Sequence, residues 1–177
     1  MVSVRRKCFI SYHHQDQMAV DKFVRDFDHS LDTFFSRGLG QEMTDEIINS
    51  QNTDYVMSRI RERFLKDSTV TIVLMGKCTW ARRYIDWEIQ SSLRQGQYST
   101  PNGLLGIKLP GFGDFPDRFR LNLSSDWPRV DCYARHMEYP NSTSDLIDAI
   151  EAAYGRRTTH NHLIENPRNR MVYNRQC

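Results

Sequence analysis

The sequence lacks any long apolar run. No stretch of its 177 residues approaches the roughly 20 consecutive apolar residues that a membrane-spanning helix needs. The N-terminal segment, MVSVRRKCFISY, has basic residues but no apolar core followed by a small-residue cleavage site, so it does not resemble a secretory signal. These absences predict a cytoplasmic protein with no membrane partner.

Cysteine is scarce and irregularly spaced. The four cysteines form no CxxC pair and no dense framework of the kind found in zinc sites or in small secreted disulfide proteins. Cys8 and Cys78 lie in or beside apolar runs, where a buried, reduced thiol is expected. We therefore predict no metal site.

An excess of charge of one sign is also missing. The chain carries 24 basic and 22 acidic residues, a net charge of +2, which is too balanced to indicate a nucleic-acid-binding protein. Hydrophobic residues make up 39% and charged residues 26%, as in ordinary globular proteins. The length is suited to one folded domain with a real core.

Glycine is absent from the loop that follows the first predicted strand, Ser11 to Asp16. Phosphate-binding loops and dinucleotide-binding turns need glycines there, because the backbone must approach a phosphate closely. The strongest predicted strand ends in Met75, Gly76 and Lys77, without the aspartate that a phosphoacceptor receiver domain would place there. The first absence argues against a P-loop or dinucleotide-binding protein, and the second argues against a phosphoacceptor receiver domain.

Apolar periodicity predicts strands alternating with amphipathic helices. Strands are expected at 7–12, 69–75 and 103–109, with weaker candidates at 31–35, 129–132 and 137–139; helices are expected at 16–27 with Asp16 as a cap, at 54–66, at 80–94, and at 144–155 with Gly155 as the stop. This order favours right-handed βαβ units and a mostly parallel sheet with helices on both faces. The charges of 59–63 fall mostly off the apolar stripe of their helix, so we expect a solvated face there.

The composition changes after Gly155. Residues 156–177 contain five arginines, one acid and few large apolar side chains. We predict an α/β domain over 1–155 and an arginine-rich tail over 156–177 that is loosely packed or is ordered by a partner.

Two stretches carry a resemblance to a known family. CFISYHHQD, over 8–16, resembles the first-strand motif of Toll/interleukin-receptor (TIR) and TIR-like domains. VTIVLMGKCTWARRYIDWEIQSSL, over 70–93, resembles the strand-to-helix segment that carries the glutamate of enzymatic TIR domains, which an aromatic residue precedes by four positions. Tyr84 and Glu88 have this spacing, with tyrosine in place of the usual tryptophan and Ile85 in place of the usual cysteine.

The chain is most similar in these stretches to the bacterial TIR-like proteins of the Thoeris anti-phage defence system. The resemblance implies a flavodoxin-like, three-layer α/β fold and cleavage of the nicotinamide–ribose bond of NAD+. It also implies ring closure to a cyclic ADP-ribose-type signal that reaches a separate effector protein. NAD+ is then a substrate, no cofactor is expected, and activity requires a trigger or self-association.

Glu88 is the predicted catalytic residue. On a helical wheel it falls between an aliphatic face and an aromatic side, where a carboxylate is partly desolvated. Loss of nicotinamide develops positive charge on the ribose, and a fixed carboxylate stabilises that charge. The competing interpretation is a solvated glutamate paired with nearby arginines. The residues predicted to bind the substrate are Ser11, Tyr12, His13, Trp80 and Tyr84; loop packing explains Tyr12 and His13 equally well.

Two non-enzymatic alternatives remain open. The first is a TIR-like module that only assembles with itself or with a partner. The second is a receiver-like binding domain that works without phosphorylation. The missing aspartate makes the second less attractive. A fold by itself does not decide between these functions.

Overall fold

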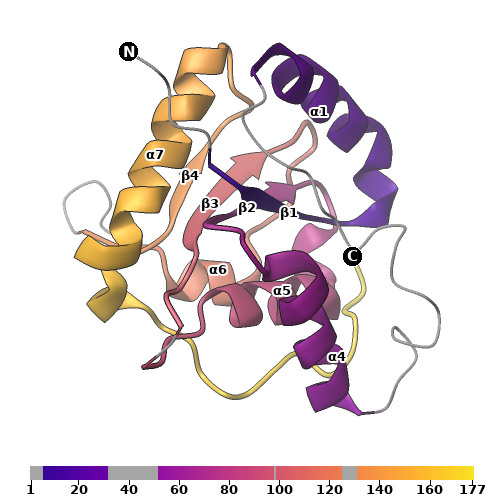
Figure 1. The fold of residues 1–177 in the computed structure, drawn as a ribbon. Coiled ribbons are helices and arrows are strands. Elements are labelled where there is room, and N and C mark those ends of the chain that lie inside the picture. The colour runs from indigo at the N-terminus through magenta and orange to yellow at the C-terminus, as the bar shows by residue number, and fades with distance from the viewer. Residues whose placement is uncertain (1–5, 32–51, 98, 125–130) are drawn as a thin grey trace.

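Four parallel strands form the central sheet of the computed structural model, which describes residues 6–31, 52–97, 99–124 and 131–177 (Figure 1). In the described residues the strands follow chain order across the sheet: β1 (Cys8–Tyr12), β2 (Val70–Met75), β3 (Gly103–Lys108) and β4 (Arg135–Met137). All three pairings are parallel, with Cys8 opposite Val70, Val70 opposite Gly103 and Leu105 opposite Arg135. The predicted parallel α/β sheet is confirmed.

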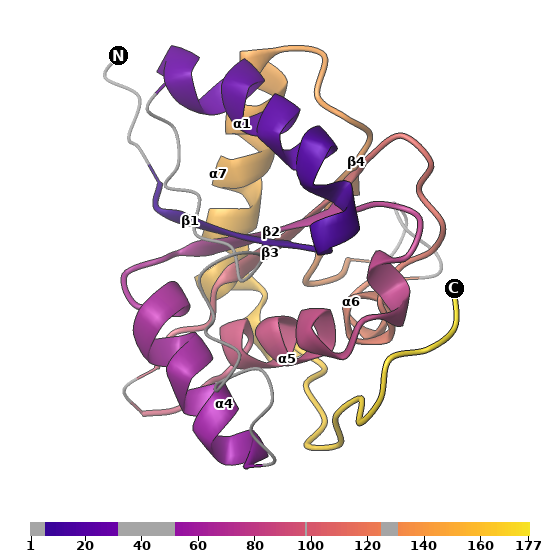
Figure 2. The same cartoon turned by 90° about the vertical axis from the view of Figure 1, so that its right-hand side faces the viewer.

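Helices cover the sheet on both faces, which gives the three layers expected from the sequence. Figure 2 shows α1 and α7 on one face and α4, α5 and α6 on the other. The main helices are α1 (Gln17–Leu31), α4 (Thr53–Ile60), α5 (Arg83–Ser92), α6 (Asp117–Leu121) and α7 (Thr143–Thr159). Shorter helical turns are η1 (His14–Asp16), η2 (Arg61–Leu65, a π-turn that continues α4), η3 (Thr79–Ala81) and η4 (Asn161–Leu163).

The hydrophobic core lies on both faces of the sheet, because successive side chains along a strand point to opposite faces. Ile10 and Ile72 pack in the cluster formed with α1 and α7. Phe9 and Val73 point the other way, into clusters formed with α4, α5 and α6. Every residue of β2 is buried, as expected for a strand covered on both faces. Each such large apolar side chain contributes about 1.5–3 kcal/mol by leaving water.

Gly103 permits the close approach of β3 to α7. A Cβ atom at this position would lie 2.2 Å from the backbone oxygen of Ala153, far inside van der Waals contact. Only a residue without a side chain lets the helix sit this close to the start of the strand.

Several predicted boundaries are wrong. The last helix does not stop at Gly155 but continues to Thr159. A Cβ at Gly155 would meet nothing within 4 Å, so the glycine lies on an open face, where its cost of about 1 kcal/mol is tolerated. The last strand is at Arg135–Met137, earlier than the predicted 137–139. Of the other weak candidates, 32–35 and 129–130 lie outside the described residues, Leu31 ends α1, and 131–132 are not in a strand.

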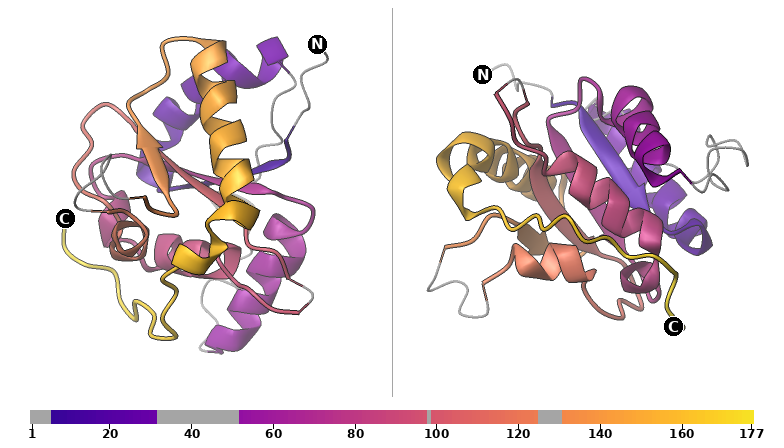
Figure 3. Two further views of the ribbon diagram at one scale, coloured as in Figure 1. Left: turned by 90° about the vertical axis from the view of Figure 1, so that its left-hand side faces the viewer. Right: turned by 90° about the horizontal axis from the view of Figure 1, so that it is seen from below.

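The C-terminal segment is tightly bound, so the prediction of a loosely packed tail is wrong. Figure 3 shows it running along α5. The indole Nε1 of Trp87 donates to the backbone oxygen of Met171 at 2.9 Å, and the backbone nitrogen of Arg175 donates to the oxygen of Ala81 at 2.9 Å. The C-terminal segment makes both bonds through its main chain, so its amino-acid composition gives no sign of them. The division of the chain at 155/156 stays a prediction.

A disulfide joins Cys78 to Cys177, 99 residues later, so the expectation that Cys78 is reduced is wrong. The two Cα atoms lie 5.5 Å apart, which is within the usual range for a disulfide. Cys8 is a free, buried thiol as expected, and so is Cys132.

None of the helices in the described residues is long and apolar enough to cross a membrane. The same residues contain no group of three or more His, Cys, Asp or Glu side chains placed to hold a metal ion.

Candidate active site

Glu88 lies in the middle of α5, on the side of the helix that faces the sheet. Ile85 and Ile89, four residues apart, bury their side chains against the sheet and fix the rotation of the helix. Glu88 is brought under the edge of β1 by the same rotation, and only 1% of its surface is exposed. The hydroxyl of Ser11, on β1, donates a hydrogen bond to Glu88 Oε2.

Burial changes the acidity of this carboxyl group. It raises the pKa of Glu88 to about 8, because the ionised form loses its hydration, and the Ser11 hydrogen bond only partly opposes the effect. Glu88 therefore carries a proton at neutral pH in the free protein. A cation arriving beside it would favour the ionised form.

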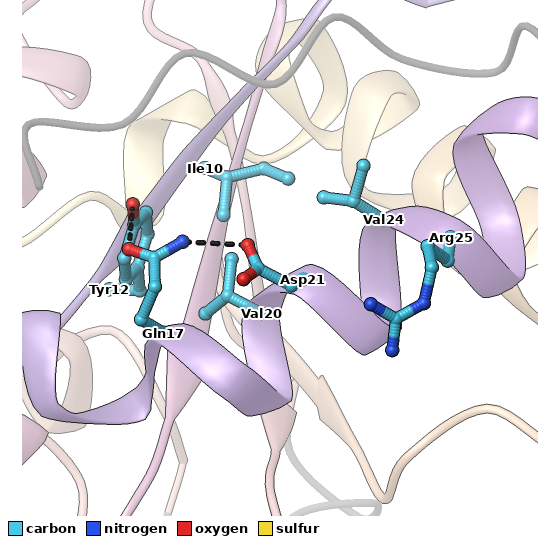
Figure 4. Close-up of a pocket in the computed structure, with 7 residues that line it drawn as sticks. All are labelled: Ile10, Tyr12, Gln17, Val20, Asp21, Val24 and Arg25. Carbon is cyan, nitrogen blue, oxygen red and sulfur yellow. Dashed lines mark hydrogen bonds between the residues drawn. The ribbon is translucent and has the colours of Figure 1, made fainter. Parts of the chain in front are cut away.

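Ser11 and Tyr12 point to opposite faces of the sheet, as successive residues of a strand must. Ser11 is fully buried against α5. Tyr12 instead lines a cavity of about 310 Å³ between β1 and α1, where its hydroxyl donates to Gln17 Oε1 at 2.9 Å (Figure 4). The structure thus joins Ser11 to Glu88 and keeps Tyr12 apart from both. The substrate-binding role of Tyr12 stays a prediction.

His13 is buried at the carboxyl end of β1, with 5% of its surface exposed. Burial, with a smaller electrostatic contribution from neighbouring His14 and Arg82, lowers the pKa of His13 to about 4, so the ring is neutral at physiological pH. Within the described part of the chain, its Nε2 has no hydrogen-bond partner, and neither do the buried Nε atoms of Arg82 and Arg83. Unpaired buried polar atoms are costly. Their presence at the beginning of α5 marks a place where a polar ligand would be stabilised.

Trp80 and Tyr84 are both half-buried near the start of α5. The ring of Tyr84 packs edge-on against Trp87, with 5.3 Å between centroids, and its hydroxyl accepts from Arg83 Nη2 at 3.0 Å. Tyr84 therefore belongs partly to the cluster beneath β1 and α4. The roles of Trp80 and Tyr84 in substrate binding stay predictions.

Asp16 links the loops after β1 and β2. It accepts from the hydroxyl of Thr79 at 3.3 Å, and Thr79 Oγ1 in turn accepts from the backbone nitrogen of Gly76 at 2.9 Å. A Cβ at Gly76 would lie 2.3 Å from the Asp16 carboxylate oxygens, so a larger residue there would displace the Asp16 side chain. Burial raises the pKa of Asp16. Asp16 thus reaches across to the β2 loop, which the expectation of a simple helix cap did not anticipate.

Asp86 is a positioning residue that sequence reasoning left unassigned. Its carboxylate accepts from Arg118 Nε at 2.8 Å and from the backbone nitrogen of Met171 at 2.9 Å. Arg118 also donates to the backbone oxygens of Pro167 at 2.9 Å and Asn169 at 2.6 Å. This buried pair ties α5, α6 and the C-terminal segment together. The only available signal was an acid two positions before Glu88, with no indication of its partner.

These features define a class of protein: a parallel α/β domain with polar loops at the carboxyl ends of its strands, where such folds bind ligands, and the buried carboxyl group of Glu88 beneath them. Residues 9–113, more than half of the chain, match the family described as Thoeris protein ThsB, TIR-like domain. The chain belongs to this family. The resemblance drawn from the two sequence motifs is confirmed.

One relative is a protein of Bacillus cereus (strain MSX-D12) named "Putative cyclic ADP-D-ribose synthase ThsB1". It is 25% identical over 115 residues, which cover 62% of this chain and 54% of that protein. The match thus spans about half the length of the relative.

Proposed function

We propose that this protein cleaves the nicotinamide–ribose bond of NAD+ and closes the ADP-ribose into a cyclic signal for anti-phage defence. The family membership and the name of the relative support the reaction class. The observation that carries the assignment to this chain is the Glu88 carboxyl, which is buried, is held by Ser11 and has a raised pKa.

Chemically, the bond between the ribose carbon and the nicotinamide nitrogen breaks, and its electron pair leaves with nicotinamide as a neutral group. The sugar becomes cationic. Glu88 releases its proton to solvent as the cationic substrate binds, and its carboxylate then stabilises the developing charge in a site of low polarity. A nucleophilic atom elsewhere in the ADP-ribose attacks the same carbon and closes the ring, whereas attack by water would give linear ADP-ribose. Ser11 acts as a positioning residue that orients the carboxylate.

His13 extends the proposed site toward the carboxyl end of β1. Its neutral ring and unpaired Nε2 suit a hydrogen bond to a polar group of the substrate, and Trp80 and Tyr84 offer aromatic surface near the start of α5. Tyr12 is not included in the proposed site, because its hydroxyl is hydrogen-bonded to Gln17 on the other face of the sheet. The proposed substrate, NAD+, and the genome of an infecting phage are both found inside the cell. The proposal therefore places the protein in the cytoplasm, where the released cyclic product reaches its effector.

The experiment is to incubate the purified protein with NAD+, with and without an extract of phage-infected cells as a source of trigger, and to separate the products by chromatography. Wild-type protein should release nicotinamide and a cyclic product. Glu88→Gln, nearly isosteric but without the charge, should lose at least about 100-fold in turnover, in line with the removal of one electrostatic stabiliser of a transition state.

Glu165→Gln is the matched control, because Glu165 is exposed and lies outside the proposed site. The substitution makes the same chemical change, from carboxyl to carboxamide. It should keep wild-type turnover. Equal turnover in Glu88→Gln and wild type would remove Glu88 from the mechanism, and release of linear ADP-ribose alone would replace the cyclase with a simple hydrolase.

The alternative, a non-catalytic assembly module, is favoured by one observation: Glu88 is so deeply buried that a neutral, purely structural carboxyl fits its surroundings as well. In that case neither condition of the assay gives product, and light scattering shows concentration-dependent self-association that Glu88→Gln leaves unchanged.

A further inference from the structure

Four arginines line a second cavity, of which Glu88 is not a lining residue. The cavity has a volume of about 660 Å³ and lies between α4, the second half of α5 and the C-terminal segment. Its lining residues of interest are Arg61 from η2, Arg94 after α5, and Arg168 and Arg170 from the C-terminal segment. The volume is within the range of small-molecule sites, about 300–1,000 Å³.

The positive charge of this cavity is poorly compensated. Among the described residues that line the cavity, Asp54 is the single acid, so the formal charge of these residues is 4 − 1 = +3. Asp54 accepts from Arg170 Nη2 at 3.3 Å, but its side chain is 91% exposed and therefore screened by water. Arg61, Arg94 and Arg168 make no side-chain hydrogen bond or ion pair within 6–31, 52–97, 99–124 and 131–177.

The arginines also act on one another. Burial and the charges of Arg94 and Arg170 lower the pKa of Arg61, and they outweigh the opposing effect of Asp54 and Glu62. An anion placed in the cavity would relieve this repulsion. The sequence interpretation of 59–63 as a solvated face therefore misses Arg61, which is half-buried and lines the cavity.

Neutral hydrogen-bonding groups complete the lining. Gln90 holds Arg170 in place by accepting from its Nε at 2.8 Å, while Gln95, Ser91 and Asn166 add polar groups. Guanidinium groups bind phosphate through two parallel hydrogen bonds. The amide donors of Gln90, Gln95 and Asn166 are already bonded to backbone oxygens, so the arginines supply the ligand contacts. The combination is that of a site for a compact, highly charged anion.

We propose that this cavity binds a phosphate-bearing small molecule of pyrophosphate or nucleotide size, with Arg61, Arg94 and Arg168 as its phosphate contacts. The confined volume and the nearly balanced charge of the whole chain favour a small ligand over a nucleic acid. The site goes beyond the proposed reaction. It is lined by the last turn of α5 and the residues after it, and neither Glu88 nor His13 of the proposed NAD+ site is among its lining residues.

The test is calorimetric titration of the full chain with inorganic pyrophosphate at fixed salt. Arg94→Gln and Arg168→Gln each remove an exposed arginine without a partner among the described residues, so the fold should be kept, as thermal unfolding will check. Each should weaken the Kd about tenfold or more. Arg25→Gln is the control, because it removes the same charge from an exposed position of α1, on the opposite face of the sheet, and should stay within about twofold of wild type.

The proposal is overturned if wild type gives no binding heat at millimolar pyrophosphate, or if Arg25→Gln weakens binding as much as Arg94→Gln does. Tighter binding of a single-stranded oligonucleotide that displaces pyrophosphate would also overturn it, in favour of a nucleic-acid interface. Glu88→Gln should bind pyrophosphate like wild type, so failure of this site and failure of the proposed NAD+ chemistry are distinguishable.

Discussion

Asp86 and Glu88 lie two residues apart on α5, and both are buried, with 7% and 1% of their surfaces exposed. Asp86 has an opposite charge beside it and a backbone donor from the C-terminal segment. Among the described residues, the only side-chain hydrogen bond that Glu88 accepts comes from the neutral hydroxyl of Ser11. The comparison teaches that burial alone does not define a reactive carboxyl. A buried acid whose charge is matched holds the structure together, and one without a matching charge is available for chemistry.

The largest expected effect on stability comes from Asp86→Asn. It leaves the Arg118 guanidinium buried with its charge unmatched and should lower the free energy of unfolding by about 3–5 kcal/mol. Urea denaturation of this variant and of the shape-matched Glu88→Gln measures the difference. Equal destabilisation of the two variants at pH 7 would show that the charge partner of Asp86 does not distinguish it from Glu88.

Next in size is the loss of the disulfide. Cys177→Ser removes a cross-link between residues 99 apart and should cost about 2–4 kcal/mol under oxidising conditions. Under reducing conditions, wild type and variant should unfold together. The measurement is thermal unfolding with and without dithiothreitol. A variant as stable as oxidised wild type would show that the hydrogen bonds of the C-terminal segment hold it without the disulfide.

The pH dependence of stability separates the contribution of Glu88 from that of His13. The pKa of Glu88 is about 8 in the folded protein and about 4.5 when unfolded, so between these values the folded state binds the extra proton and stability falls as pH rises. His13, with its pKa lowered from 6.5 to about 4, has the opposite effect: its contribution is present above pH 6.5 and is lost as pH falls toward 4. The Glu88 contribution is therefore isolated between about pH 6.5 and 8.

Over that interval the melting temperature of wild type should fall with rising pH, and Glu88→Gln should abolish most of the fall, because glutamine has no proton to lose. Melting curves at several pH values test this. Parallel curves for the two proteins would mean that Glu88 titrates at its ordinary pKa.

The smallest effect is expected from Ser11→Ala. It removes one hydrogen bond to Glu88 and should change the unfolding free energy by only about 1 kcal/mol. Because the hydrogen bond from Ser11 favours the ionised carboxylate, its loss should also raise the pKa of Glu88. Carbon-13 NMR of the labelled glutamate follows this pKa. An unchanged pKa would show that Ser11 does not control the carboxyl.

The predicted site was only partly assembled by sequence reasoning. Glu88 was found from its spacing to Tyr84 on one helix, and Ser11 from a motif in one strand. The same strand periodicity also implies that Ser11 and Tyr12 face opposite sides of the sheet, and that signal was not used when both were assigned to the substrate. Asp86 was missed because its partner, Arg118, is 32 residues away on another element.

The sequence by itself determined the alternation of β1, β2 and β3 with α1, α4, α5 and α7, the complete burial of β2, and the helix face on which Glu88 lies, because periodicity is encoded in neighbouring residues. It did not predict α6 or the position of β4. Only the tertiary structure decided that Ser11 meets Glu88 across 77 residues, that Cys177 reaches Cys78, and that arginines from three segments share one cavity. Such pairings depend on how whole helices and strands pack, and no local sequence pattern specifies which distant side chain a residue will contact.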